Sequence, residues 1–153
     1  MPPAAGLGDP FPPLGGTSAA GTEVALPAGQ AGRPFVAVFG FSRDSAPRSR
    51  VWGERIAGAY GTRVAIYALP VLDTVPAAFR GLALALVRKS TPADGRERVV
   101  PLFDAQWRAW LRPPDPDDPA VVVVGSDGRV AALYCGPYSD GALARLRSVL
   151  DRF

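Results

Sequence analysis

The sequence predicts one α/β domain in three layers, with a central mixed β-sheet flanked by helices. Two observations predict this class. Apolar runs rich in β-branched and aromatic residues alternate with segments of helical periodicity over residues 34–90. After an insertion at about residues 89–118, a valine-rich strand and a returning strand flank an Asp-Gly turn, and an amphipathic segment follows. Two parallel strands joined by a helix, followed by an antiparallel hairpin, give a mixed sheet with helices on both faces.

The first 33 residues are expected to precede the main domain, residues 34–153, as a tail and a hairpin. Residues 1–9 are predicted to be a mobile tail, and Phe11 and Leu14 are expected to anchor the chain on the core. A glycine turn and a short strand complete the expected hairpin. The high content of proline, glycine and alanine leaves a disordered leader as the alternative.

The central element is a predicted buried strand, residues 35–41, followed by a sharp polar turn and a helix over residues 46–59. Asp44 or Ser45 is expected to cap this helix, and Pro47 suits its first turn. The positive end of the helix dipole and free backbone N–H groups then face the turn.

A second parallel strand is predicted over residues 63–69, and a second helix over about residues 73–88. Phe79, Leu82 and Leu86 recur at i, i+3 and i+7 along this helix. This spacing places the three side chains in one stripe, which we expect to pack on the core.

The insertion is expected to contain an extended segment and a short helix that carries Trp107 and Trp110. These tryptophans have two interpretations, an exposed recognition patch or the packing of the inserted helix. The proline-rich residues 113–119 cannot form a helix or a central strand. They lead into a predicted hairpin and a last helix that Ser139 is expected to cap.

The composition argues against several kinds of site. The chain has 153 residues, a net charge of +3, one cysteine and no histidine. We therefore expect no intrachain disulfide, metal site, cofactor or histidine base. The basic residues are scattered among acids, which does not indicate nucleic-acid binding. No apolar run is long enough to span a bilayer and no secretory signal is evident, so we expect a cytoplasmic protein.

Several motifs in order along the chain carry a resemblance to a known family. They are the leader at residues 8–12, the strand and turn at residues 35–48, Pro119 before a valine-rich strand, the hairpin at residues 124–130, and Gly136. Their order resembles the thioredoxin fold in its redoxin form, the branch of the alkyl hydroperoxide reductase/thiol-specific antioxidant proteins. In that resemblance Pro119 matches the family's cis-proline, so we expect the Asp118–Pro119 bond to be cis; a purely structural role in the turn explains this proline equally well.

The sequence departs from the family at the active-site positions. Where redoxins carry their cysteines, this chain has Ser45 and Arg48. A serine hydroxyl lacks the acidity of a thiol, and no base is present to activate it. The resemblance therefore implies the fold and not the chemistry.

One branch of the group fits better than the others. The motif at residues 39–43, Trp52, the long insertion and the ending at residues 121–146 resemble the thioredoxin-like family of mitochondrial ATP-synthase assembly factors and its bacterial look-alikes. That resemblance implies a protein that lacks the redox pair and acts by binding protein.

The expected binding surface joins the first helical turn to the loop before the valine-rich strand. An extended peptide is predicted to bind there by strand addition, with an arginine on its carboxylate. The residues expected at this surface are Ser42, Arg43, Ser45, Pro47, Arg48, Asp118 and Pro119.

Two classes of function follow. The first is a redox-inactive protein that binds a protein or peptide partner as an assembly or chaperone-type factor. The alternative is a thiol-dependent oxidoreductase that works through Cys135. Cys135 is interpreted either as a small apolar residue of the core or sheet edge, or as a reactive monothiol. The sequence does not indicate an oligomeric state.

Overall fold

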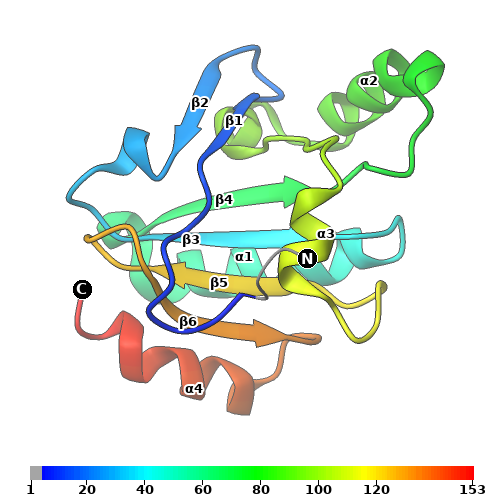
Figure 1. Cartoon of the computed structure of the whole chain (residues 1–153). Coiled ribbons are helices and arrows are strands. Elements are labelled where there is room, and N and C mark those ends of the chain that lie inside the picture. Colours follow the sequence, from blue (N-terminus) through cyan, green and yellow to red (C-terminus); the bar gives the residue numbers. More distant parts are fainter. Residues whose placement is uncertain (1–4) are drawn as a thin grey trace.

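A computed structural model describes residues 5–153, and its centre is a four-stranded sheet in the order β4-β3-β5-β6 (Figure 1). β3 (Phe35–Gly40) pairs in parallel with β4 (Ala65–Pro70) and antiparallel with β5 (Ala120–Val124). β5 pairs antiparallel with β6 (Val130–Cys135). The predicted mixed sheet and its C-terminal hairpin are confirmed.

The two central strands are apolar along their length because both of their faces are covered. All five residues of β5 are buried, as are the first five of β3. Alternate side chains enter two different cores. Phe35 and Val122 belong to one, and Val36 and Val123 belong to the other.

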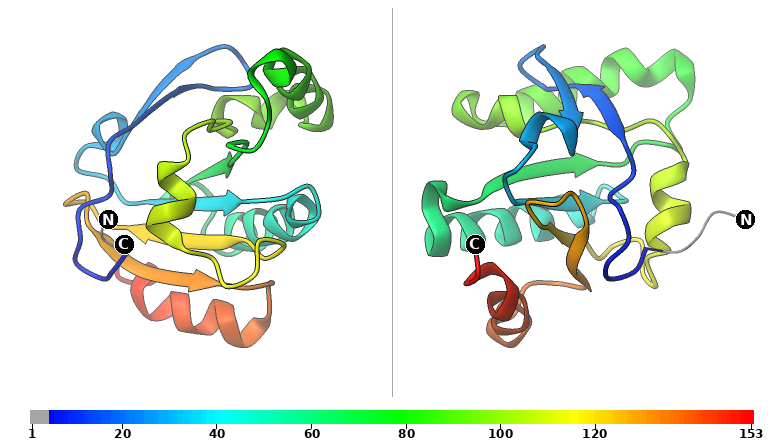
Figure 2. Two further views of the ribbon diagram at one scale, coloured as in Figure 1. Left: turned by 45° about the vertical axis from the view of Figure 1, so that its right-hand side comes forward. Right: turned by 60° about the vertical axis from the view of Figure 1, so that its left-hand side comes forward.

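Helices and loops cover the two faces of the sheet unequally. α1 (Ser45–Tyr60) and α4 (Asp140–Leu150) pack on one face, and α3 (Gln106–Leu111) and the N-terminal segment pack on the other (Figures 1 and 2). Trp107 and Trp110 of α3 are buried. They pack the inserted helix, so the interpretation as an exposed patch is wrong.

The N-terminal segment is ordered against the sheet. β1 (Leu14–Thr17) and β2 (Glu23–Leu26) form the expected antiparallel hairpin, which a short 3₁₀ helix follows at Ala28–Gln30. Phe11 and Leu14 are buried, as predicted. The disordered leader is thus wrong for these residues. Part of the predicted tail, residues 5–9, makes backbone hydrogen bonds to the body of the chain; residues 1–4 lie outside the described part.

The second helix differs most from its prediction. A 3₁₀ turn at Ala77–Phe79 leads into α2 (Arg80–Ser90), and no residue of α2 is buried. Phe79, Leu82 and Leu86, expected in the core, are 58%, 60% and 51% exposed.

The insertion explains why α2 lies outside the core. After a 3₁₀ segment at Ala93–Arg98, the chain runs parallel to the edge of β4. The N–H of Val100 donates to Ala68 O, and that of Leu102 donates to Pro70 O. Both of these apolar side chains are buried in the core that contains Phe35 and Val122, the packing that the sequence predicts for the second helix.

Two predicted helix ends are confirmed. Gly61, with φ of 56°, ends α1 and donates its N–H to Ala57 O; a 3₁₀ turn at Gly61–Arg63 follows. Ser139 caps α4 by accepting the N–H of Ala142 at 3.0 Å. In the described part of the chain, no helix combines the length and apolar character that crossing a bilayer requires.

Candidate functional site

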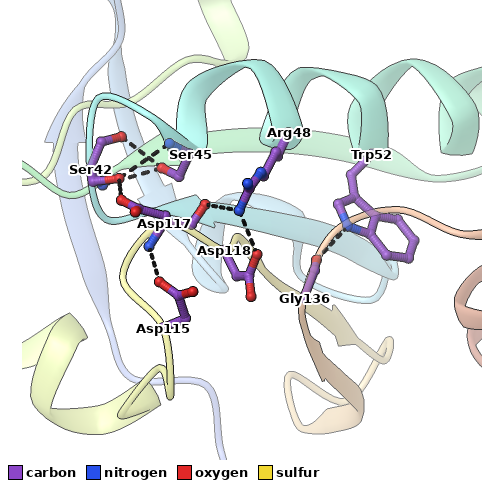
Figure 3. A network of polar contacts seen from close by, with 8 residues as sticks. All are labelled: Ser42, Ser45, Arg48, Trp52, Asp115, Asp117, Asp118 and Gly136. Carbon is purple, nitrogen blue, oxygen red and sulfur yellow. Dashed lines mark hydrogen bonds and ion pairs between the residues drawn. The ribbon is translucent and has the colours of Figure 1, made fainter.

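The first turn of α1 is closed by two serines (Figure 3). The Ser45 hydroxyl donates to Ser42 O at 2.7 Å and accepts the N–H of Ser42 at 3.2 Å. The N–H of Ser45 donates to the Ser42 hydroxyl, also at 3.2 Å. Asp44 occupies the N-cap position, but its side chain makes no capping hydrogen bond. The expected cap by Asp44 or Ser45 is therefore replaced by a reciprocal pair that leaves Ser45 fully buried.

The end of β3 fits closely beneath this turn. A Cβ atom at Gly40 would lie 2.9 Å from Ser45 Oγ and 3.2 Å from Ser49 Oγ. The Ser49 hydroxyl is buried and has no hydrogen-bond partner among the described residues. The turn therefore has no space for a side chain at Gly40.

An acidic loop, residues 115–118, is tied to the same turn. Arg48 Nη1 lies 2.8 Å from Asp118 Oδ1 and 3.1 Å from Asp117 O. The Ser42 hydroxyl donates to Asp117 Oδ1 at 2.8 Å. Figure 3 shows these side chains between the helix and the loop. The structure thus brings together residues 42–48 and the loop before Pro119, as the sequence predicts.

One expectation about this loop is wrong, and another stays a prediction. The guanidinium of Arg48 is paired within the chain by the acidic loop itself, so its pairing with a partner's carboxylate stays a prediction. The peptide bond before Pro119 is trans, and the described part of the chain has its cis bond at Leu26–Pro27. Asp115 closes the loop locally, because its carboxylate accepts the N–H of Asp117 and its carbonyl accepts the N–H of Asp118.

Strand addition at this loop is limited by the same hydrogen bonds. The N–H groups of Asp117 and Asp118 are both occupied, and Pro119 has none. The carbonyl of Pro119 accepts the N–H of Gly136 at 2.9 Å. The accessible groups here are therefore side chains, including the exposed Arg43, Pro47 and Arg48.

Cys135 lies at the same end of the sheet as this turn. The strand register places it opposite Ala120, which in turn lies opposite Phe39. Burial raises the pKa of the Cys135 thiol, and the nearby Asp118 carboxylate raises that pKa further. The thiol therefore stays protonated at neutral pH, whereas nucleophilic and redox chemistry requires the thiolate. The sequence contains the signal for this position. The Asp-Gly turn and the lengths of the two strands that flank it place Cys135 beside the start of β5.

Sequence reasoning missed an ion pair next to this turn, between Arg108 and Asp73. Arg108 of α3 contacts both carboxylate oxygens of Asp73, at 3.0 and 2.8 Å, and donates to Phe41 O at 3.0 Å. The hydrogen bond from Arg108 lowers the pKa of Asp73 below its ordinary value. Asp73, at the predicted start of the second helix, instead fixes α3 beside the end of β3.

A hollow in the described part of the chain lies away from this turn. This hollow, of about 410 Å³, lies at the opposite end of the sheet, between the N-terminal segment and the hairpin turn at Gly125–Gly128. None of the expected binding residues lines it. In the part of the chain that the structure describes, no three acidic, cysteine or histidine side chains are grouped to hold a metal ion.

Comparison with solved structures identifies the fold. A candidate thiol:disulfide interchange protein DsbE of Chlorobium tepidum matches with a TM-score of 0.67 at 16% identity, covering 97% of this chain and 98% of that one. The thiol peroxidase of Chromobacterium violaceum matches with 0.60 at 14% identity, covering 99% and 92%. BsSco, of the Sco family of cytochrome c oxidase assembly proteins, matches with 0.58 at 15% identity, covering 95% of each chain.

These neighbours are thioredoxin-like and redoxin proteins, so the chain has a thioredoxin-like fold, as its sequence motifs predict. Identities this low show the fold alone. No protein-family model and no curated protein matches the sequence. The likeness to ATP-synthase assembly factors stays a prediction.

Proposed function

We propose that this chain is a redox-inactive thioredoxin-like protein that binds a protein or peptide partner, as an assembly or chaperone-type factor. The observation that carries the proposal is the first turn of α1, where Ser45 is buried and bonded to Ser42. A hydroxyl in this setting has neither the acidity of a thiol nor a base to activate it. The neighbour BsSco, from a family of assembly proteins, supports an assembly role on this fold.

The alternative, a thiol-dependent oxidoreductase using Cys135, has less support. The thiol is half-buried at the end of β6, and burial together with Asp118 raises its pKa. Both effects disfavour the thiolate that would attack a disulfide or a peroxide.

The proposed binding surface comprises the first turn of α1 and the acidic loop. Arg48 is 47% exposed in its side chain and Asp118 is 24% exposed, so their ion pair is open to competition. An extended polar or acidic peptide would bind here by placing one of its carboxylates on Arg48 in place of Asp118. Such a partner is a protein and not a nucleic acid, and we place the interaction in the cytoplasm.

Redox activity is tested directly with insulin disulfide and peroxide reduction assays using thiol donors. We expect no turnover above the uncatalysed rate, and slow labelling of Cys135 by a thiol reagent in the folded protein. Cys135→Ser is the control variant. Turnover comparable to a redoxin, lost in Cys135→Ser, would show that the alternative is correct.

The binding surface is tested on a partner recovered by pull-down from the native organism. Arg48→Ala is expected to weaken the complex about fivefold, the loss of roughly 1 kcal/mol from one partly exposed contact. Asp118→Asn should strengthen the complex, because it releases Arg48 from its intrachain partner. Arg145→Ala, an exposed arginine on α4, is the matched control. If Arg145→Ala weakens binding and Arg48→Ala does not, the surface is wrong.

A further inference from the structure

α2 carries an apolar stripe that no other described part of the chain covers. Leu82 and Leu86 lie on one side of α2, and Phe79, the N-cap residue, continues that stripe; each of the three is more than half exposed. Leu84 is also 42% exposed, but it lies two positions from Leu82 and from Leu86 and so faces another side of the helix. Single exposed hydrophobic residues are normal on a protein surface, but contiguous ones mark an interaction site.

The helix also lacks the packing that would hold it. Helices shorter than about 12–15 residues are marginal in water unless an apolar side is buried. α2 has 11 residues and buries none of them. Figures 1 and 2 show it at the outer end of the molecule, away from α1 and α4. An apolar surface outside the chain would supply the missing contact.

The charges on α2 and its preceding turn have one sign. Between residues 77 and 90 they are Arg80, Arg88 and Lys89, and the sequence there contains no acidic residue. The 3₁₀ segment that contacts the end of α2 adds Asp94 and Glu97 as well as Arg96 and Arg98, so the region stays net positive. Arg88 and Lys89 are exposed in the last turn. Pairing α2 with the same helix of a second copy brings these like charges together in either orientation. The occupant that fits the stripe is therefore negatively charged.

The size of the helix distinguishes a membrane from a protein partner. A helix of 11 residues is about 16 Å long and about 10 Å wide. Its footprint falls well short of the roughly 800 Å² that each partner buries in a stable protein interface. A bilayer has no such minimum, because apolar side chains enter the headgroup boundary while basic residues attract anionic lipids.

From these observations we propose that α2 docks the protein peripherally on anionic lipid bilayers, with Phe79, Leu82 and Leu86 in the headgroup boundary. The basic side chains of Arg88 and Lys89 bind the lipid charge at the end of the helix. This interaction goes beyond the proposed partner binding at α1 and does not depend on it.

The test is co-sedimentation of the full chain with vesicles. We expect binding to vesicles of equal parts phosphatidylcholine and phosphatidylserine, weaker binding at high salt, and none to phosphatidylcholine alone. Leu82→Ser with Leu86→Ser should lower the partition coefficient at least about tenfold, since two apolar anchors are lost. Arg88→Gln with Lys89→Gln should lower it roughly thirtyfold.

Matched variants elsewhere serve as controls. Leu7→Ser removes a leucine that is 70% exposed outside α2, and Arg145→Gln with Arg147→Gln removes two exposed charges from α4. Both should bind like the wild type, and circular dichroism checks that every variant is folded. The proposal is overturned if anionic vesicles are not bound, if the leucine variant binds normally, or if the α4 variant loses as much affinity as the α2 charge variant. A concentration-dependent dimer that requires Leu82 and Leu86, without vesicle binding, would assign the stripe to a second copy.

Discussion

Gly40 is the residue on which the packing beneath the first turn of α1 depends. We expect Gly40→Ala to lower the free energy of unfolding by about 1–3 kcal/mol, because its Cβ would meet the two serine hydroxyls. Gly58→Ala, in the exposed part of α1 with nothing near its Cβ, should raise stability by about 0.5–1 kcal/mol. Urea unfolding of both variants measures the difference. Equal effects of the two substitutions would show that the turn has room to adjust.

Residue identity alone could not predict the partner of Arg48. The sequence shows an arginine in the first helical turn and a distant run of aspartates, and both facts are compatible with a partner's carboxylate. The intrachain ion pair arises because Asp115 closes the loop and turns Asp118 toward the helix. The trans bond at Pro119 shows that a proline placed before a core strand does not by itself set the isomer of its peptide bond.

At the scale of elements, the Asp73–Arg108 pair joins α3 to the loop after β4. The pKa of Asp73 lies below its ordinary value of 3.8, so this pair stabilises the fold above about pH 4 and is lost as the pH falls through the lower folded-state pKa. We therefore expect the free energy of unfolding to fall more steeply below pH 4 in the wild type than in Asp73→Asn. The matched control is Asp94→Asn, an exposed aspartate with no side-chain hydrogen bond or ion pair in the described structure. If the free energy of unfolding falls equally with pH in the wild type and in Asp73→Asn, the Asp73–Arg108 pair does not contribute to stability in this range.

Helical periodicity predicted that α2 exists and which of its residues form a stripe. It could not predict what covers that stripe, because periodicity describes one element and burial depends on its neighbours. The extended segment with Val100 and Leu102 was itself foreseen in the sequence. Its pairing with β4 was not, since an isolated bridge leaves no repeated pattern in the residues.

At the scale of the whole molecule, the N-terminal segment shares the core of the sheet. The Phe11 ring lies 5.4 Å from that of Phe35 and 5.6 Å from those of Trp107 and Trp110. Phe11→Ala should therefore lower the free energy of unfolding by about 3–5 kcal/mol. Phe79→Ala, at an exposed position, should change it by less than about 0.5 kcal/mol.

The same packing predicts a single unfolding transition for residues 1–33 and 34–153. Tryptophan fluorescence and far-ultraviolet circular dichroism should give coincident urea curves. Two separate transitions would mean that the N-terminal hairpin is an independent unit, as the division of the sequence at residue 33 suggests.

The sheet has two outer strands, and other segments of the chain cover part of the edge of each. Open strand edges are templates for aggregation, because their unpaired N–H and C=O groups accept a strand from another molecule. The inserted segment occupies the edge of β4 through the bridges at Ala68 and Val71, and the N-terminal segment occupies the start of β6 through Gly8 and Asp9. We therefore expect a chain shortened at either of these irregular stretches to retain its central strands but to aggregate more readily, because an unpaired strand edge is then open to another molecule.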